Sequence, residues 1–534
     1  MPVYLFFMQK IMQRTNLILL ILLGLSSTRV NCQIWQHTYG VQSHYEICTS
    51  VVKGDYNGFT MGISRDSRAM WIVKADINGN ILWDKSLYDI VNNTFIIHSV
   101  DIDNSQNIYI SGGVYPGDSM LCALLKLNNC GELEWCKKIS MGNSNFGLFA
   151  KVTSSSNIRL LTYGASEYSV IDRFQLWEID PEGNIIWMKQ VLPGTQTYFQ
   201  NTEFTQMCLT SDGGSLMAGY TYYPYDTTNN PYDAVLQPCL VKCDSQGDMQ
   251  WVYPPLSGAD TTKLGFFTSC TQIGNTYYAA GSHYQLGTEF FLRPLVARFD
   301  LNGNLLSYNY TPADTMYHEL TQIVSATDTS LLLISAANTV FTDPNYLMVF
   351  IADTMGNLQK SFTRTDLVVG QFGDEVAKMR DNKFIIPCQS PLGWPGPLTD
   401  VVAIKLNANL EYDSVYTQPF TYDSLCPYPI VSDTILCNCE PFVGLDKSVA
   451  ISKTAMLGIS PNPATGKFVV KTENMANAIG RLQVFSVWGK LLNQLDIQAG
   501  DKEITVHFSG WPSGLYLVRV EKGGVVVSGK VVIY

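Results

Sequence analysis

Six histidines are the first candidates for catalysis in this sequence of 534 residues, because an imidazole titrates near neutral pH and can also bind a metal. They are His37, His44, His98, His283, His318 and His507. No two of them stand at metal-ligand spacing, and no cysteine pattern has the spacing of a zinc site. The motifs of serine hydrolases, zinc proteases, P-loops and dinucleotide sites are also missing from the sequence. We therefore predict no catalytic residue, cofactor or metal site, and assign each histidine to a turn or to the core.

Paired carboxylates offer a second kind of chemistry. Asp101 and Asp103 end a short strand-like run at 99–103. Two carboxylates near a channel could act as the acid and base of a glycosidase. Acids at strand ends also cap turns by accepting backbone N–H groups, and this second interpretation is favoured. An extracellular hydrolase or lyase that uses such carboxylates stays as the alternative function.

Aromatic loops suggest binding rather than catalysis. The stretch YTYYPYDTTNNPYDAVLQP (220–238) is followed by aromatic loops at 282–291, 338–346 and 390–400. Aromatic rings supply apolar area while neighbouring Asn and Asp side chains give direction, which suits sugars or peptides. The candidate ligand-binding residues are Tyr222, Tyr223, Tyr225, Tyr232, Tyr284 and Trp394. The alternative is that these rings only pack the loops against the rest of the protein.

A repeat must position all of these groups. Its markers are one glycine per unit: Gly79, Gly131, Gly183, Gly247, Gly303 and Gly356, with Ala408 in the same slot. The intervals are 52, 52, 64, 56, 53 and 52 residues. Four residues after each marker stand Trp83, Trp135, Trp187, Trp251, Ser307, Lys360 and Tyr412. Seven units of this length are typical of a β-propeller.

Each unit contains four short strand signals. In the second unit they lie at 99–103, 107–114, 121–128 and 132–139. The Asn-Gly and Glu-Gly steps tolerate a positive φ, as a tight hairpin between the third and fourth strands requires. DINGN (76–80) lacks the register of a calcium loop and is predicted to be such a hairpin. The sequence thus predicts an all-β protein with a seven-bladed β-propeller over 33–417.

Two segments compete for the strand that closes the ring. QIWQHTYG (33–40) matches a fourth strand that has no preceding three. NLEYDSVY (409–416) also resembles a fourth strand, so that eight candidates fill seven positions. Either segment could close the ring, or the ring could have eight blades with one unit unrecognised; seven blades are the favoured count. The loops between second and third strands are expected on the face where propeller ligands usually dock.

The first 32 residues are predicted to be a signal peptide. Lys10 and Arg14 precede the apolar run at 16–25, which is too short to span a bilayer. We expect cleavage after Cys32, with Gln33 as the mature N-terminus; the alternative is a lipoprotein in which Cys32 is lipidated. The net charge of −11 argues against a nucleic acid or an anionic membrane as partner.

The cysteines point to an oxidising compartment. Thirteen become twelve without Cys32, and an even number allows full pairing. Cys122 and Cys136 flank a hairpin and are expected to be able to face each other across it. Three more cysteines lie in a stretch without clear strand period at 418–455, which is predicted to be a linker: Cys426, Cys437 and Cys439.

The C-terminal residues restart the strand pattern. Runs at 457–472, 480–492 and 502–534 alternate apolar and polar residues around turns at Gly489, Gly514 and Gly523–Gly524. This pattern predicts a small Ig-like β-sandwich.

Residues 456–534 resemble the type A C-terminal sorting domain of the type IX secretion system. PNPATGKFVV, VFSVWGKLL and GLYLVRVEKGG follow one another in the order of that family, although the chain ends in GKVVIY, with its lysine slightly upstream of the end. The motif residues are Pro461, Asn462, Pro463, Gly514, Tyr516 and Lys530. The resemblance implies export through the periplasm and passage across the outer membrane, followed by removal of the domain by a sortase-like peptidase.

The repeat region resembles uncharacterised propellers that occur as cargo of such domains, which implies architecture and location only. We therefore expect a secreted or cell-surface protein that binds a glycan or a protein through its loop-rich face.

Overall fold

The computed structural model describes residues 34–40, 44, 46–65, 69–89, 95–114, 120–139, 144–166, 169–192, 202–224, 234–254, 263–285, 291–310, 317–338, 346–368, 375–391, 399–416, 426, 432–441, 457–472, 479–486, 491–522 and 525–534. The predicted signal peptide lies outside them. The chain divides into two compact units, 1–442 and 443–534. The described residues contain many strands and one short 3-10 helix, η1 (Asp55–Asn57). None of their helices has the length and apolar character needed to cross a membrane.

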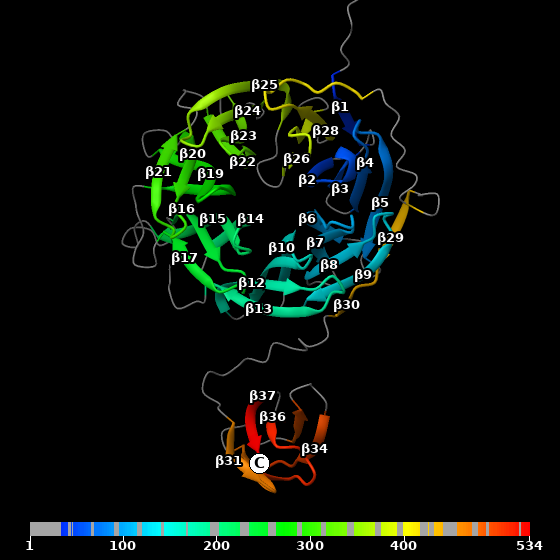
Figure 1. The fold of residues 1–534 in the computed structure, drawn as a ribbon, viewed down its shortest axis with the longest axis vertical. Helices are drawn as coiled ribbons and strands as arrows, with labels where there is room; N and C mark the ends of the chain where they lie inside the picture. The colour runs from blue at the N-terminus through cyan, green and yellow to red at the C-terminus, as the bar shows by residue number, and fades with distance from the viewer. Residues whose placement is uncertain are drawn as a thin grey trace, which may run out of the picture. The chain divides into compact units, whose positions relative to one another are not determined.

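The first unit is a β-propeller made of antiparallel sheets arranged around a central axis (Figure 1). Most neighbours within a sheet are consecutive strands, and the strands labelled β2, β6, β10, β14 and β22 lie nearest the axis. Three sheets have four strands each. One contains β10 (Ser144–Val152), β11 (Ile158–Ser166), β12 (Ser169–Ile179) and β13 (Ile185–Val191). The next contains β14 (Thr202–Leu209), β15 (Ser215–Pro224), β16 (Ala234–Cys243) and β17 (Met249–Tyr253), and the third contains β18 (Gly265–Ile273), β19 (Thr276–Gln285), β20 (Phe291–Phe299) and β21 (Leu305–Tyr310).

Two further sheets each gain a fifth strand from late in the chain. The first contains β2 (Glu46–Lys53), β3 (Phe59–Arg65), β4 (Ala69–Ala75) and β5 (Ile81–Asp89), with β29 (Asp433–Cys437) added to β5. The second contains β6 (Phe95–Ile102), β7 (Ile108–Val114), β8 (Leu121–Leu127) and β9 (Leu133–Ile139), with β30 (Glu440–Pro441) added to β9.

The remaining strands of the ring are joined in one eight-stranded sheet through a single residue pair, Val368 with Gln389. It contains β22 (Tyr317–Thr327), β23 (Ser330–Asn338), β24 (Tyr346–Asp353) and β25 (Leu358–Val368), then β26 (Ala377–Lys378), β27 (Phe384–Pro391) and β28 (Thr399–Leu406), and finally β1 (Gln36–Tyr39).

The repeated turns are built by an acid and a glycine. In the first sheet the Oδ1 atom of Asp76 accepts the backbone N–H groups of Asn78 and Asn80, both at 2.8 Å. Gly79 has φ +83°, a conformation that strains any residue with a Cβ. The corresponding glycines of the next five units have φ between +79° and +88°. The carboxylate is therefore an internal cap for the turn.

The repeated tryptophans join each sheet to the next. Trp83 Nε1 donates to the Asn129 carbonyl at 3.3 Å, and its ring lies against Gly131 of the following turn. Trp135 and Trp251 make the same donation to Pro181 at 3.0 Å and Leu301 at 3.1 Å. The turns at Gly79, Gly131, Gly183, Gly247 and Gly303 each receive the tryptophan of the preceding strand pair, which gives the hairpin motif a role in joining one sheet to the next.

Both segments that competed for the closing strand take part in closure, in different roles. β1 pairs antiparallel with β28, from Gln36 opposite Ile404 to Tyr39 opposite Val401. Residues 409–416 form a turn and two isolated bridges, one of which joins Ser414 to Ile34. Trp35 then repeats the contact of the other tryptophans, donating to the Ile77 carbonyl at 2.9 Å. The ladder is thus closed by the N-terminal strand.

The prediction that Cys122 and Cys136 face each other is wrong. Cys136 lies opposite Leu125 and is bonded to Cys439, whereas Cys122 lies opposite Ile139 and is a buried free thiol. The two cysteines belong to the apolar clusters on opposite faces of their sheet. An odd offset along the ladder places side chains on different faces.

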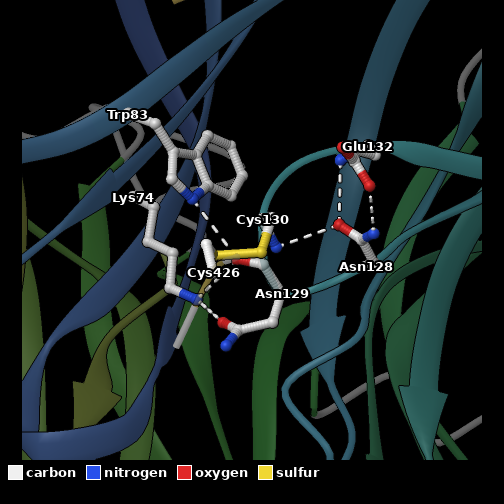
Figure 2. The surroundings of a disulfide bond; sticks show 7 residues. All are labelled: Lys74, Trp83, Asn128, Asn129, Cys130, Glu132 and Cys426. Atoms are coloured by element: carbon white, nitrogen blue, oxygen red, sulfur yellow. Dashed lines mark hydrogen bonds between the residues drawn. A yellow bond between two sulfur atoms is a disulfide. The ribbon is translucent and has the colours of Figure 1, made fainter. Parts of the chain in front are cut away.

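A strap formed by Cys426 and residues 432–441 follows the outer edge of the first two sheets. β29 runs parallel to β5 and β30 runs parallel to β9. Cys426 is bonded to Cys130, as Figure 2 shows. Cys439 is bonded to Cys136. These strands lie within 418–455, which the sequence predicted to be a linker. They cover two exposed sheet edges that would otherwise offer unpaired backbone groups.

The second unit also consists of strands. The order across it is β34 (Leu491–Ile497), β33 (Gly480–Ser486), β36 (Gly514–Lys522), β37 (Val525–Ile533), β31 (Gly458–Thr465), β32 (Lys467–Lys471) and β35 (Glu503–His507). They enclose their own apolar core, which includes Phe468, Val484 and Val518.

Candidate functional site

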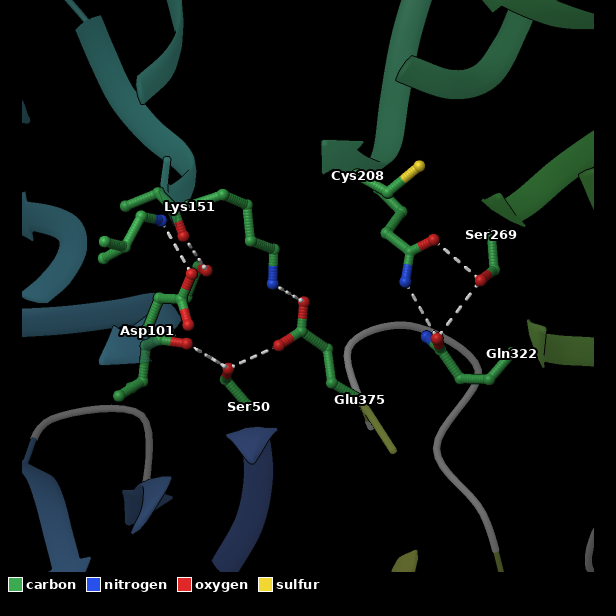
Figure 3. Close-up of polar contacts among 12 residues, drawn as sticks. Ser50, Asp101, Lys151, Cys208, Ser269, Gln322 and Glu375 are labelled. Atoms are coloured by element: carbon green, nitrogen blue, oxygen red, sulfur yellow. Dashed lines mark hydrogen bonds and ion pairs between the residues drawn. The ribbon is translucent and has the colours of Figure 1, made fainter. Parts of the chain in front are cut away.

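A cavity of about 330 Å³ lies where the innermost strands of the propeller meet. Its walls come from the last residues of β2, β6, β10, β14, β18 and β22, together with the segment around β26. Figure 3 shows that the polar side chains lie in two groups. The cavity is therefore a composite of segments that are far apart in the sequence.

The first group carries charge. Lys151 Nζ lies 2.8 Å from Glu375 Oε1, and Ser50 Oγ donates to Glu375 Oε2 at 2.7 Å. Asp101 accepts backbone N–H groups from Val152 at 2.7 Å and from Ile102 at 2.9 Å. These contacts link β2, β6 and β10, so the acids hold neighbouring sheets together.

Burial and charge act on the pKa values of this group in opposite directions. Burial raises the pKa of Asp101, although Lys151 and the backbone N–H groups partly offset the effect. Burial lowers the pKa of Lys151, but Glu375 and Asp101 more than compensate, and the resulting pKa is above its usual value. Lys151 is therefore held as a cation.

The second group consists of amides, a hydroxyl and two thiols. Gln206 Nε2 donates to Gln322 Oε1 at 3.0 Å, and Ser269 Oγ donates to Gln206 Oε1 at 2.7 Å. The Sγ atoms of Cys208 and Cys270 are 3.5 Å apart. This side can offer hydrogen bonds and sulfur to a small polar molecule.

The predicted acids separate in the structure. Asp101 lines the cavity, whereas Asp103 caps a turn by accepting the N–H groups of Ser105 at 2.8 Å and Asn107 at 2.9 Å. No histidine is among the residues that line the cavity. Burial lowers the pKa of His98 to about 4, and it also lowers the pKa values of His37 and His283.

Of the six predicted aromatic residues, only Tyr284 has a described side chain. Tyr225, Tyr232 and Trp394 lie outside the described residues, as do the side chains of Tyr222 and Tyr223 at the end of β15. Tyr284 is half-buried and packs in a small cluster with Tyr220, Phe266, Leu236 and Leu292. That contact is the packing role that the sequence left as the alternative.

The cavity and the described end of β15, where Tyr222 and Tyr223 stand, lie at opposite ends of β14. Thr202 at the start of β14 pairs with Thr221, next to the tyrosines, whereas Leu209 at its end pairs with Ser215. The cavity takes its residues from the end near Leu209. A ligand in the cavity and a ligand on the aromatic loops would thus bind different faces.

No motif in the sequence pointed to the cavity residues Lys151, Gln206, Gln322 and Glu375. They belong to no repeated motif, because the positions that face the channel differ from one inner strand to the next. The repeated signal near them was a hydroxyl: Ser50, Ser99 and Ser269 each hydrogen-bond to the backbone of the neighbouring inner strand.

The motif residues of the second unit converge on its last strand. Asn462 Nδ2 donates to the Lys530 carbonyl at 2.8 Å, and Asn462 Oδ1 accepts the N–H of Val532 at 2.9 Å. Tyr516 donates its hydroxyl to the Pro512 carbonyl at 2.5 Å. Gly514 pairs with Ile533, while Pro461 and Pro463 flank Asn462 in β31. The motif therefore anchors β37.

Comparison with known families gives this second unit its class. Residues 458–534 match the model described as the secretion system C-terminal sorting domain, and they are a type IX sorting domain. That domain implies export to the cell surface or the extracellular space and interaction with the type IX secretion machinery. No curated protein matches the chain.

Several solved structures resemble this chain at low sequence identity. The β-propeller domain of the Trilobed protease from Pyrococcus furiosus has a TM-score of 0.43 at 10% identity, over 70% of this chain and 99% of that one. The polysaccharide lyase Uly1 has a TM-score of 0.44 at 11% identity, over 71% and 94%. A protein of unknown function from Bacteroides caccae has a TM-score of 0.31 at 13% identity, over 51% and 84%.

Proposed function

We propose that this is an exported binding protein whose propeller recognises a glycan or a protein. The observation that carries the proposal is the state of the acids in the cavity. Asp101 accepts two backbone N–H groups and Glu375 accepts a lysine and a serine. A general acid and base need oxygens that can reach a substrate, and these oxygens are already used by the fold.

The aromatic loops supply the proposed ligand face. They connect second to third strands, at the end of the ring where the chain also passes from one sheet to the next. Aromatic side chains there would stack on sugar rings or on apolar peptide surfaces. The proposal keeps Tyr222, Tyr223, Tyr225, Tyr232, Tyr284 and Trp394 as ligand contacts.

We also infer seven blades for the ring and an Ig-like sandwich for the sorting domain. Six blades would each be formed by consecutive strands, and the seventh by β26, β27 and β28 with β1. The cavity supports this count because seven innermost segments contribute to its wall. After passage through the periplasm, a sortase-like peptidase would remove the sorting domain.

An extracellular hydrolase or lyase is the second candidate. It is favoured by the raised pKa of Asp101, which would help that carboxyl act as an acid, and by the presence of Glu375 in the same cavity. Polysaccharide cleavage that is lost in both Asp101→Asn and Glu375→Gln would establish this function instead.

The proposed function can be tested by screening the full chain on glycan and peptide arrays. We expect saturable binding that falls at least tenfold when Tyr222, Tyr223, Tyr225 and Trp394 are all changed to alanine, because each ring removed takes apolar contact area from the ligand. Tyr56→Ala is the matched control, since Tyr56 is 49% exposed and lies between β2 and β3, at the other end of its sheet.

Equal binding by the wild type and the fourfold variant would overturn the assignment to the loop face. A folded wild type that binds no probe on either array would overturn the binding function.

A further inference from the structure

Two cysteines from neighbouring sheets meet in the wall of the cavity. Cys208 lies next to the last residue of β14 and Cys270 lies in β18, and their Sγ atoms are 3.5 Å apart. A disulfide has an S–S distance near 2.05 Å, so an approach of about 1.5 Å is needed, which small side-chain rotations can supply. Neither sulfur takes part in the two disulfides of the strap.

Hydrogen bonds hold the two strands in this position. Gln206 Oε1 accepts the backbone N–H of Cys270 at 2.6 Å and the hydroxyl of Ser269 at 2.7 Å. Gln206 is two residues before Cys208, so one amide fixes both cysteine-bearing segments against each other. The closeness of the sulfurs is therefore built into the inner wall.

The two thiols differ in their access to the cavity. Cys208 is partly exposed, whereas Cys270 is 2% exposed. Burial raises the pKa of Cys270 well above its usual value, and the contact with Cys208 raises it further. Lys151 interacts electrostatically with Cys208, and its positive charge would stabilise the negative charge that develops on sulfur during exchange.

We propose that Cys208 and Cys270 form a thiol–disulfide exchange site in the channel, whose substrate is a small-molecule or protein disulfide. Cys208 loses its proton and attacks one sulfur of the substrate disulfide. A mixed disulfide forms and one substrate thiolate leaves. Cys270 then loses its proton and attacks Cys208 Sγ, which gives the Cys208–Cys270 bond and releases the second thiolate. The two protons lost by the cysteines pass through water to the two released thiolates. The two cysteines are oxidised and the substrate disulfide is reduced.

The bond would tie two inner strands that share no ladder. β14 and β18 belong to separate sheets. The strap disulfides show that the same fold accommodates disulfides that join distant segments. The inference is independent of the proposed glycan or protein ligand, because it concerns the opposite end of the channel from the aromatic loops.

Oxidised glutathione is the probe for this site. The native full chain is incubated with it, quenched with acid, unfolded, alkylated with iodoacetamide and digested without reduction. We expect mass spectrometry to find the Cys208 and Cys270 peptides linked to each other, while the buried Cys239 and Cys243 are alkylated as thiols. A linkage already present in the purified protein supports the proposal equally.

Variants identify the order of the two steps. Cys270→Ser should accumulate a mixed disulfide between Cys208 and glutathione, since the resolving thiol is missing. Cys208→Ser should leave Cys270 unmodified, because Cys270 is buried. Circular dichroism tests whether both serine variants are folded. If one of them is not, the corresponding alanine variant, Cys208→Ala or Cys270→Ala, takes its place. Two results with the wild-type protein would overturn the proposal. In one, Cys208 and Cys270 are both recovered as alkylated thiols after the incubation; in the other, the mixed disulfide with glutathione persists.

Discussion

At the scale of single residues, the glycine of the repeated turn at position 247 is fixed by two separate demands. Gly247 has φ +80°, and a Cβ there would lie 2.3 Å from Trp187 Cζ3. Gly274 also has a positive φ, +54°, but its Cβ would meet nothing within 4 Å. A comparison of substitutions at Gly247 and Gly274 therefore separates backbone strain from the clash with a tryptophan.

We predict that Gly247→Ala destabilises the protein more than Gly274→Ala. The control should cost about 1 kcal/mol for the left-handed conformation alone. The clash should add about 1–3 kcal/mol in Gly247→Ala. The measurement is denaturant unfolding, repeated in a Trp187→Leu background, where the excess should disappear. An equal cost at both positions would contradict the role given to the tryptophan.

Glu319 is a buried acid that makes stability depend on pH. Its side chain lies in β22 and is 3% exposed, and burial raises its pKa from 4.5 to about 7. Between these values the folded state keeps a proton that the unfolded state has released. Stability from this group is therefore present in full below pH 4.5 and is lost as the pH rises to about 7.

The wild-type protein should lose about 3 kcal/mol of unfolding free energy between pH 4.5 and 8, the size that a pKa shift from 4.5 to about 7 implies. We predict that Glu319→Gln removes this loss. The unfolding free energy of both proteins is measured across this range, and the difference between them isolates Glu319 from the histidines that titrate there. If the unfolding free energies of the two proteins changed with pH in the same way, Glu319 would be ionised in the folded protein at pH 5.

At the scale of elements, the strap is the feature that most needs covalent support. β30 has two residues, and the chain returns to blades formed about 300 positions earlier, since Cys130–Cys426 and Cys136–Cys439 span 296 and 303 residues. Lys85–Asp433 and Lys137–Glu440 add ion pairs whose acids are exposed and which therefore contribute little. The disulfides and the burial of Ile435 and Cys437 must hold the strap.

We predict that the double variant Cys426→Ser, Cys439→Ser loses about 2–5 kcal/mol of stability, because each bond restricts the unfolded chain over a long loop. Cys437→Ala, in the same strap but outside the disulfides, should lose less. Denaturant unfolding measures both variants, and limited proteolysis should release the strap only from the double variant. A double variant as stable as Cys437→Ala would show that side-chain packing alone holds the strap.

The same element shows where prediction from sequence stops. The turns were predictable because Asp, Gly and Trp recur at fixed spacing and each acts locally or on the next unit. The strap was not predictable, because nothing in the sequence near residues 433–437 specifies pairing with β5. A short apolar run of this kind is instead typical of a linker. Asp101 was found at a strand end, but Glu375 precedes a strand of two residues and gave no periodic signal.

At the scale of the whole molecule, the ring depends on a strand from the beginning of the chain. Trp35 and Tyr39 are buried in a cluster that also contains Phe59 of β3 and Val401 and Ala403 of β28. Tyr39 donates its hydroxyl to the Gly79 carbonyl at 2.7 Å. β1 therefore contacts the last sheet through its backbone and the first sheet through its side chains.

We predict that a chain starting at residue 41 is destabilised by more than the 3–5 kcal/mol typical of removing one buried tryptophan, because it also loses the β28 ladder. A synthetic peptide of residues 33–40 should restore the unfolding midpoint in a concentration-dependent way, as expected for a ligand that binds only the folded state. The same peptide with Trp35→Ala should fail, because it keeps the ladder and the Tyr39 hydrogen bond but lacks the tryptophan's contact with the first sheet. If both peptides restored the midpoint equally, closure would rest on the backbone ladder alone, and the repeated tryptophans would be needed within the ring but not at its junction.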